Sequence, residues 1–312
     1  MKYLSLCSGI EAATVAWHPL GWEAVAYSEI EKFPSQVLAH HYPHTPNLGD
    51  MTKFKEWSIE SDVDLLVGGT PCQSFSVAGL RKGLDDPRGN LMLTFLAIAK
   101  QYRPNWLVWE NVPGVLSSNG GRDFGSFLGG LAECGYGFAY RVLDAQYFGV
   151  AQRRRRVFVV GYLGDWRPPA AVLFERESLR RDTAPSREKG KDASRSAAQC
   201  FEPRSPDGHA RLIGDFSPTL NRMGGGQREP CVMIPEEISG TLTARGVTSF
   251  RRLTPVECER LQGFPDNYTN IPWRKEEEAP DGPRYKALGN SMAVPVMHWI
   301  GNRIKMLTSC TN

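Results

Sequence analysis

Three kinds of side chain in this sequence could carry out chemistry together: a cysteine thiol, a carboxyl group and a run of arginines. Cys72 lies in the segment 68–76, Gly-Gly-Thr-Pro-Cys-Gln-Ser-Phe-Ser, Glu110 follows the apolar stretch 106–109, and arginines fill positions 153–156. A thiolate is a nucleophile, a carboxyl group can act as a general acid, and guanidinium groups bind phosphates and carbonyl oxygens. Together they would suit covalent catalysis on a phosphate-bearing substrate.

Cys72 is predicted to lie just beyond the end of a strand. The apolar run 63–67 is typical of a short buried strand, which the following Gly-Gly-Thr-Pro ends. In open α/β sheets, ligands bind beyond the carboxyl ends of the strands. A lone cysteine is more often a buried structural thiol. Here the preceding proline fixes the backbone and the following residues are polar, which favours a nucleophile.

Glu110 is predicted at the tip of a second buried strand, 106–109, and Asn-Val-Pro follows it. A glutamate at a strand end is most often only solvated. One that emerges between tryptophan and valine side chains is expected to have a raised pKa, because burial disfavours the carboxylate form. Glu110 would then serve as a general acid.

The arginines lead directly into an apolar strand, 157–160. Because side chains alternate along a strand, Arg154 and Arg156 would lie on one face, and Arg153 and Arg155 on the other. Two guanidinium groups on one face would suit phosphates and the carbonyl group of a base. A solvated or nucleic-acid-facing patch is the usual meaning of such a run.

The N-terminal part of the chain predicts a nucleoside-type cofactor. An apolar strand, 3–7, is followed by a turn at Gly9 and a helical pattern, and such a turn directs backbone N–H groups at a ligand. The next strand, 24–27, ends near Glu29, whose carboxylate is placed to accept hydrogen bonds from ribose hydroxyls. Asp50, after a further short strand, would offer a second carboxylate.

The composition indicates an ordinary globular chain. Of the 312 residues, 41% are hydrophobic and 23% are charged, and the net charge of +3 is too small to imply nucleic acid. No apolar run is long enough to cross a membrane, and the first residues lack a signal-peptide pattern, so we expect a cytoplasmic protein. The seven scattered cysteines lack metal-ligand spacing, which favours free thiols and no bound metal.

Three further segments complete the chain. Residues 79–90 are glycine-rich and basic, and predict a loop able to close over a polyanion. From about 168 to 250 the periodicity is lost, which predicts a small irregular domain with little sheet, or partly disordered loops. Order returns in a helix that begins with a capping box at Thr254 and ends at Gly263. A final apolar helix, 296–306, is expected to pack on the first strand.

In their order along the chain, these segments resemble the DNA cytosine-5 methyltransferase family of bacterial or phage type. The most specific are Pro-Cys-Gln at 71–73 and Glu-Asn-Val at 110–112, joined by Gln-Arg-Arg-Arg-Arg at 152–156 and Gly-Asn-Ser at 289–291. The resemblance covers nearly the whole chain except 168–250.

The resemblance implies an α/β fold: a Rossmann-like S-adenosylmethionine-dependent methyltransferase domain, with a small irregular target-recognition domain inserted before the C-terminal helix. The expected catalytic and cofactor-binding domain is 1–175 plus 280–312. The expected target-recognition domain is 176–279.

The activity that the resemblance implies is methyl transfer from S-adenosylmethionine to C5 of cytosine in a specific double-stranded DNA sequence, after the base is flipped out. Cys72 would attack C6 of the base, and Glu110 would protonate or hydrogen-bond N3. Arg156 would hold the carbonyl oxygen O2, and Arg154 would support the catalytic loop or bind a phosphate.

The resemblance also implies two sets of binding residues. Those expected to contact the cofactor are Cys7, Gly9, Ile10, Glu29, Ile30, Asp50, Met51, Gly69, Pro71, Leu91, Asn290 and Ser291. Those expected to contact DNA are Gln73, Ser76, Arg81, Lys82, Arg88, Gln152, Thr241 and Leu242, with the Thr-Leu pair at 219–220 as the alternative to the last two.

One segment departs from the family pattern, which has an aromatic residue followed by Gly-x-Gly. Here Cys7 stands where the aromatic residue packs on the cofactor, and Glu11 stands in place of the second glycine. The details of cofactor contact at this turn therefore stay open.

Alternatives also stay open. The same chemistry could act on RNA, as in the tRNA-methylating branch of the family, although the long variable segment favours DNA. A non-catalytic DNA-binding homologue and an unrelated thiol enzyme are the others. The resemblance further implies a monomer in a bacterial cell, with a chromosomal or phage gene and a cognate restriction endonuclease as a candidate partner. The target sequence is not predicted.

Overall fold

The computed structural model describes residues 1–71, 91–174, 200–202, 211–214, 231–234 and 249–309. Contacts divide the chain into two compact units. Unit 1 consists of residues 1–143, 155–183 and 296–312, and unit 2 of residues 144–154 and 184–295. The units assign 144–154, 176–183 and 280–295 differently from the domains expected from the sequence, whose limits stay a prediction.

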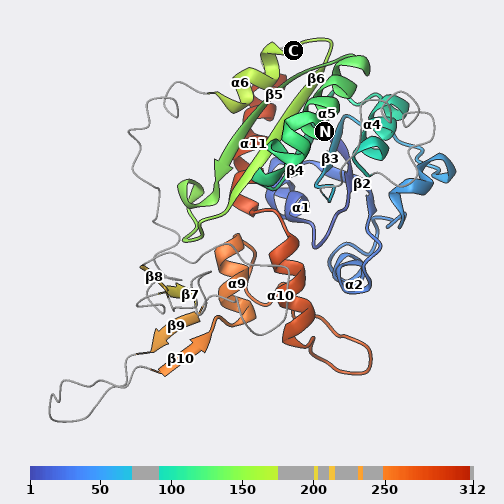
Figure 1. Ribbon diagram of the computed structural model, residues 1–312. Coiled ribbons are helices and arrows are strands. Elements are labelled where there is room, and N and C mark those ends of the chain that lie inside the picture. The colour runs from blue at the N-terminus through green and yellow to red at the C-terminus, as the bar shows by residue number, and fades with distance from the viewer. Residues whose placement is uncertain (72–90, 175–199, 203–210, 215–230, 235–248, 310–312) are drawn as a thin grey trace, which may run out of the picture. The chain divides into compact units, whose positions relative to one another are not determined.

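Unit 1 is built on a six-stranded sheet with helices on both faces (Figure 1). The strand order is β2-β1-β3-β4-β6-β5, in which β2, β1, β3 and β4 are parallel neighbours and β6 is antiparallel to β4. The strands are β1 (Lys2–Leu6), β2 (Glu23–Ser28), β3 (Leu65–Gly68), β4 (Trp106–Asn111), β5 (Tyr136–Asp144) and β6 (Arg155–Leu163). The predicted α/β fold is confirmed, and the central strands are continuous apolar runs because both faces of the sheet are covered.

Unit 1 contains six α-helices among the described residues, and the last of them includes the helix predicted at 296–306. They are α1 (Ala12–Trp17), α2 (Lys32–His41), α4 (Leu91–Tyr102), α5 (Arg122–Glu133), α6 (Arg167–Leu173) and α11 (Val294–Ser309, largely in unit 1). Short 3-10 helices are η1 (His18–Leu20), η2 (Met51–Glu56), η3 (Pro113–Leu116) and η4 (Ser118–Gly121). The short strand expected before Asp50 is reduced to an isolated parallel bridge between Tyr27 and Asn47.

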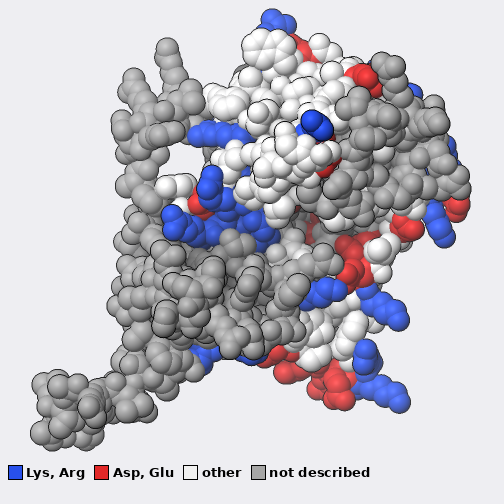
Figure 2. Space-filling model, viewed as in Figure 1, with Lys and Arg blue, Asp and Glu red and all other residues white. Residues whose placement is uncertain are grey.

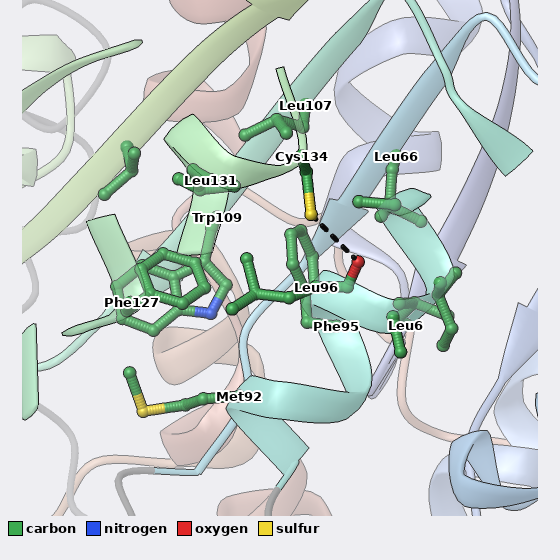
Figure 3. Packing of buried hydrophobic residues seen from close by; sticks show 14 of the residues in the cluster. Leu6, Leu66, Met92, Phe95, Leu96, Leu107, Trp109, Phe127, Leu131 and Cys134 are labelled. Carbon is green, nitrogen blue, oxygen red and sulfur yellow. Dashed lines mark hydrogen bonds between the residues drawn. The ribbon is translucent and has the colours of Figure 1, made fainter. Parts of the chain in front are cut away.

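Strand alternation separates two packed faces of the sheet. On one face, Trp109 of β4 lies among Phe95, Leu96 and Phe127 from α4 and α5 (Figure 3). On the other face, the Tyr3 ring contacts Trp17 of α1, with centroids 5.2 Å apart. These two layers hold the strand ends in place.

The last helix packs on α1. The Trp17 indole N–H donates to the Met297 carbonyl oxygen (2.8 Å), and a Cβ atom at Gly301 would lie only 2.4 Å from Trp17 Nε1. Only glycine permits this approach. These contacts are with the first helix, and packing of the last helix on the first strand stays a prediction.

Unit 2 combines helices with a small sheet. Its helices are α9 (Pro255–Gln262), α10 (Asp281–Asn290) and the 3-10 helix η5 (Ala145–Phe148). Its antiparallel sheet has the order β10-β9-β7-β8, formed by β7 (Cys200–Glu202), β8 (Arg211–Gly214), β9 (Cys231–Ile234) and β10 (Ser249–Arg252). The segment from about 168 to 250, expected to contain little sheet, thus contributes these short strands to unit 2.

The predicted capping box of α9 is confirmed. The Thr254 hydroxyl accepts from the Glu257 N–H (3.3 Å), and the Glu257 carboxylate accepts from the Thr254 N–H (2.7 Å). We expect Thr254→Ala to lower the free energy of unfolding by about 1 kcal/mol, because one helix N–H loses its acceptor. Urea denaturation followed by circular dichroism measures this. An unchanged midpoint would show that the cap adds nothing to stability.

Candidate active site

A hydrogen bond connects the turn that follows β1, at Gly9, with Glu29, the residue that follows β2. The Gly9 N–H donates to Glu29 Oε2 (2.8 Å), and the Glu31 N–H donates to Glu29 Oε1 (2.7 Å). The register of the parallel pair sets Leu6 opposite Ser28, so the segments that follow emerge at one edge of the sheet. Burial raises the pKa of the Glu29 carboxyl above its ordinary value, while backbone N–H groups act in the opposite direction.

This edge of the sheet suits a nucleoside-type ligand. Gly9 has a φ of +57°, and a Cβ atom there would meet nothing within 4 Å, so the turn is open on its outer side. Ile30 is 71% exposed beside the Glu29 carboxylate. The Ser28 hydroxyl donates to the Gly49 carbonyl (2.6 Å), which brings Asp50 to the same strand end. Exposed apolar surface next to carboxylates matches a base and its ribose hydroxyls.

Other residues expected at the cofactor are largely internal. The side chains of Ile10 and Met51 are buried, which leaves their main chain as the part able to reach a ligand. Cys7 Sγ donates to Met51 Sδ (3.5 Å). Burial first, and then the nearby Glu29 and Asp50 carboxylates, raise the pKa of the Cys7 thiol to about 12. Cys7 therefore stays a neutral thiol near pH 8.

The chain just before Cys72 is held by two side chains of β4. The Trp109 indole N–H donates to Thr70 Oγ1 (2.9 Å), and Asn111 Nδ2 donates to the Thr70 carbonyl oxygen (2.9 Å). In the register of β3 and β4, Gly68 lies opposite Trp109, so Thr70 continues the pairing toward Asn111. Both oxygen atoms of Thr70 are thus fixed two residues ahead of Cys72.

Glu110 projects from β4 between those two residues, and therefore from the opposite face of the strand. Arg156 Nε lies 3.1 Å from Glu110 Oε1, and both side chains are largely buried. Burial lowers the pKa of the Arg156 guanidinium, and the Glu110 carboxylate acts in the opposite direction. The raised pKa that the sequence led us to expect for Glu110 stays a prediction, as does its role as a general acid.

Arg154 and Gln152 belong to unit 2 and are buried. Arg154 Nη2 donates to the carbonyl oxygens of Gly289 (3.1 Å) and Ser291 (2.5 Å), where α10 ends. Arg154 thus braces the segment that contains Asn290, one of the residues expected at the cofactor. The predicted alternation of exposure holds, since Arg153 and Arg155 are exposed. Contacts of Arg154 and Gln152 with DNA stay predictions.

Several predicted site residues lie outside the described part of the chain. They are Cys72, Gln73, Ser76, Arg81, Lys82, Arg88, Thr241 and Leu242. Of the remaining predicted cofactor contacts, Pro71 is exposed and Gly69 and Leu91 are half-buried in unit 1.

The sequence interpretation did not identify Trp109 and Thr70 as site residues. The sequence did contain one signal: a buried tryptophan near a strand end needs an acceptor for its indole N–H. The identity of that acceptor, Thr70, follows only from the register of β3 and β4.

We expect Trp109→Phe to slow the methyl transfer that the sequence resemblance implies about 10- to 100-fold, because Thr70 would lose its donor and small displacements near the predicted nucleophile, Cys72, are costly. Trp106→Phe is the matched control: Trp106 lies on the same strand and packs on Tyr162, with ring centroids 4.7 Å apart. Single-turnover kinetics on the two purified variants provide the comparison. Equal rates would show that the Thr70 contact does not matter.

The described residues contain no group of three or more His, Cys, Asp or Glu side chains able to hold a metal ion. Among the described helices, none is long and apolar enough to cross a membrane. On the face that Figure 2 shows, several described Lys and Arg side chains gather in one group, and others are scattered among Asp and Glu side chains.

Comparison with known proteins identifies a matching family. A family model described as "C-5 cytosine-specific DNA methylase" matches residues 1–194 and 232–306. A Bacillus subtilis protein named "Type II methyltransferase M2.BsuMI" is 30% identical over 97% of this chain and 75% of its own length. Another, "Type II methyltransferase M.NgoPII" of Neisseria gonorrhoeae, is 29% identical over 98% of this chain and 95% of its own length.

A further relative carries a different name. A protein of Escherichia phage P1, "DNA N-6-adenine-methyltransferase", is 39% identical over 97% of this chain, which spans 61% of that protein's length. Among solved structures, the Dnmt2 methyltransferase of S. pombe has a TM-score of 0.69 at 18% identity, covering 98% of this chain and 99% of its own. At this identity, the structural likeness concerns the fold alone.

Proposed function

Because the chain belongs to the C-5 cytosine-specific DNA methylase family, we propose that it transfers a methyl group from S-adenosylmethionine to C5 of cytosine in double-stranded DNA. The observation that carries the proposal is the arrangement on β4. Glu110 is paired with Arg156, and its two neighbours hold Thr70, just ahead of Cys72. The proposal is supported by the carboxylate–guanidinium pair between β4 and β6, since β4 is also the neighbour of β3, the strand that leads to Cys72.

The proposed reaction begins with a flipped cytosine, since its reacting carbons are not accessible within a stacked duplex. The Cys72 thiolate adds to C6, and the electron pair of the C5–C6 bond makes C5 nucleophilic. Glu110 holds N3 by a hydrogen bond or a proton, and Arg156 offsets negative charge that develops toward O2. After C5 is methylated, loss of the C5 proton to a base or to water expels the Cys72 thiolate and restores the aromatic ring.

The cofactor would be held at the ends of β1 and β2. Glu29 would accept hydrogen bonds from the ribose hydroxyls, Ile30 would lie against the adenine ring, and the open side of the Gly9 turn would admit the ligand. When bound, S-adenosylmethionine supplies a methyl group from its sulfonium. Asp50, Asn290 and Ser291 are further proposed contacts.

Quantifying modified nucleosides tests the proposal. Purified protein is incubated with S-adenosylmethionine and genomic duplex DNA, and in parallel with tRNA, and the digested products are analysed by mass spectrometry. We expect 5-methyldeoxycytidine in the DNA and no modified cytidine in the tRNA. Methylation of tRNA alone would overturn the choice of DNA.

The same digest distinguishes the base. N6-methyladenine is the product suggested by the name of the phage P1 relative. In that product the methyl group is carried by the exocyclic amine of adenine, which can accept it without covalent attack by a thiol on the ring. N6-methyladenine without 5-methylcytosine would therefore contradict the proposal. If 5-methylcytosine is found, bisulfite sequencing of DNA from expressing bacteria would give the target sequence. A restriction endonuclease proposed as a partner could then be tested for cleavage at that sequence.

A further inference from the structure

We propose that Glu11 is a positioning residue for the cofactor, which holds the turn between β1 and α1 from its buried side. The inference rests on the proposed function, because that turn is assigned to S-adenosylmethionine. Glu11 lies two residues after Gly9 and is 1% exposed. It points into the protein, away from the open side of the turn.

The Glu11 carboxylate caps α1. Oε2 accepts from the Thr14 N–H (3.0 Å) and from Thr14 Oγ1 (2.5 Å), and Oε1 accepts from the Ser5 hydroxyl. The Glu11 side chain thus connects Ser5, near the end of β1, with Thr14, in the first turn of α1. A buried carboxyl group is costly unless its oxygens are bonded, and here both are.

The bonds continue into the second strand. The Thr14 hydroxyl is 2.6 Å from the Tyr3 hydroxyl and 3.1 Å from that of Tyr27. The Thr14 hydroxyl can donate to Glu11 and accept from both phenols. Burial raises the pKa of the Glu11 carboxyl above its ordinary value, while the hydrogen bonds from Ser5 and Thr14 act in the opposite direction. Tyr27 lies in β2, two residues before Glu29. The buried network therefore fixes both strands that carry the Gly9 and Glu29 contact.

The backbone of the turn needs this support. Cys7, Gly9 and Glu11 have φ values of +50°, +57° and +61°. For residues other than glycine this conformation is strained and persists only where the surroundings enforce it. A glycine at position 11 would adopt it freely but could not cap α1. The glutamate that departs from the family pattern thus replaces backbone freedom by side-chain bonds.

The experiment measures the dissociation constant for S-adenosylmethionine by titration calorimetry on full-length variants. Glu11→Ala should raise this constant about tenfold, because removing such a cap loosens the turn. Glu11→Gln retains an acceptor for Thr14 and can donate to Ser5, so it should stay within about threefold of the original protein by the same reasoning. The KM for S-adenosylmethionine should rise while the KM for DNA stays unchanged.

Thr254→Ala is the matched control, because it removes a helix cap in unit 2, whereas the turn belongs to unit 1. Unchanged S-adenosylmethionine binding in Glu11→Ala, with a loss of stability like that of Thr254→Ala, would overturn the inference. If Glu11→Ala does not fold, Glu11→Asp replaces it, since the shorter carboxylate cannot reach both Ser5 and Thr14. Unchanged S-adenosylmethionine binding in Glu11→Asp would likewise overturn the inference. Failure of the original protein to bind S-adenosylmethionine would instead contradict the proposed function.

Discussion

Replacing Cys72 by serine is expected to lower the rate of methyl transfer at least about 10³-fold, as removal of a catalytic nucleophile does in other covalent enzymes. A serine hydroxyl is far less ionised than a thiol and adds poorly to C6. Binding of DNA and of S-adenosylmethionine should persist, since neither depends on the thiolate. Nucleoside mass spectrometry gives the rate, and gel-shift and calorimetric titrations give the two affinities.

Cys134→Ser is the control for this substitution. Cys134 is a buried thiol that donates to the Leu96 carbonyl oxygen (3.8 Å) in the core of unit 1, as Figure 3 shows. A serine there can make the same hydrogen bond without touching the proposed site. If Cys72→Ser kept a rate within tenfold of the original, covalent attack by Cys72 would be wrong.

Glu110→Gln is expected to lower the rate about 10²- to 10³-fold, the usual effect of removing one group that stabilises charge in the transition state. The amide cannot protonate N3, and it removes the charge that faces Arg156. Because the substitution leaves the Gly9 turn intact, the affinity for S-adenosylmethionine should not change. Single-turnover kinetics under saturating DNA separate the chemical step from binding.

An exposed glutamate provides the comparison for Glu110. Glu133 at the end of α5 lies in unit 1 but is solvated, so Glu133→Gln should leave the rate unchanged. Comparable rates in the two variants would remove Glu110 from the mechanism. A loss in Glu110→Gln that excess S-adenosylmethionine reverses would place its role in cofactor binding.

The strand ends of the proposed site could be predicted from the sequence because they depend on local pattern. Apolar runs ended by Gly9, Glu29 and Glu110 indicate strands in an open α/β sheet, and such sheets bring the carboxyl ends of neighbouring strands together. Likewise, Thr254 followed by a proline and a glutamate is a local signal that needs no tertiary information.

The contacts that the sequence did not reveal depend on register or on distant segments. The bond from Trp109 to Thr70 requires the alignment of β3 with β4. The inward course of Glu11 follows from a left-handed backbone conformation that is rare outside glycine. The bonds of Arg154 to the end of α10 join positions more than a hundred residues apart, which no local period encodes.

Covalent trapping tests the central claim most directly. A duplex that carries 5-fluorocytosine at the target site cannot lose a proton from C5, so an enzyme that attacks C6 stays attached after methyl transfer. We expect an adduct in the presence of S-adenosylmethionine, located by peptide mass spectrometry on Cys72 and on no other cysteine, with Cys7 excluded by its raised pKa. A duplex that is methylated when unmodified but forms no adduct when fluorinated would contradict the mechanism.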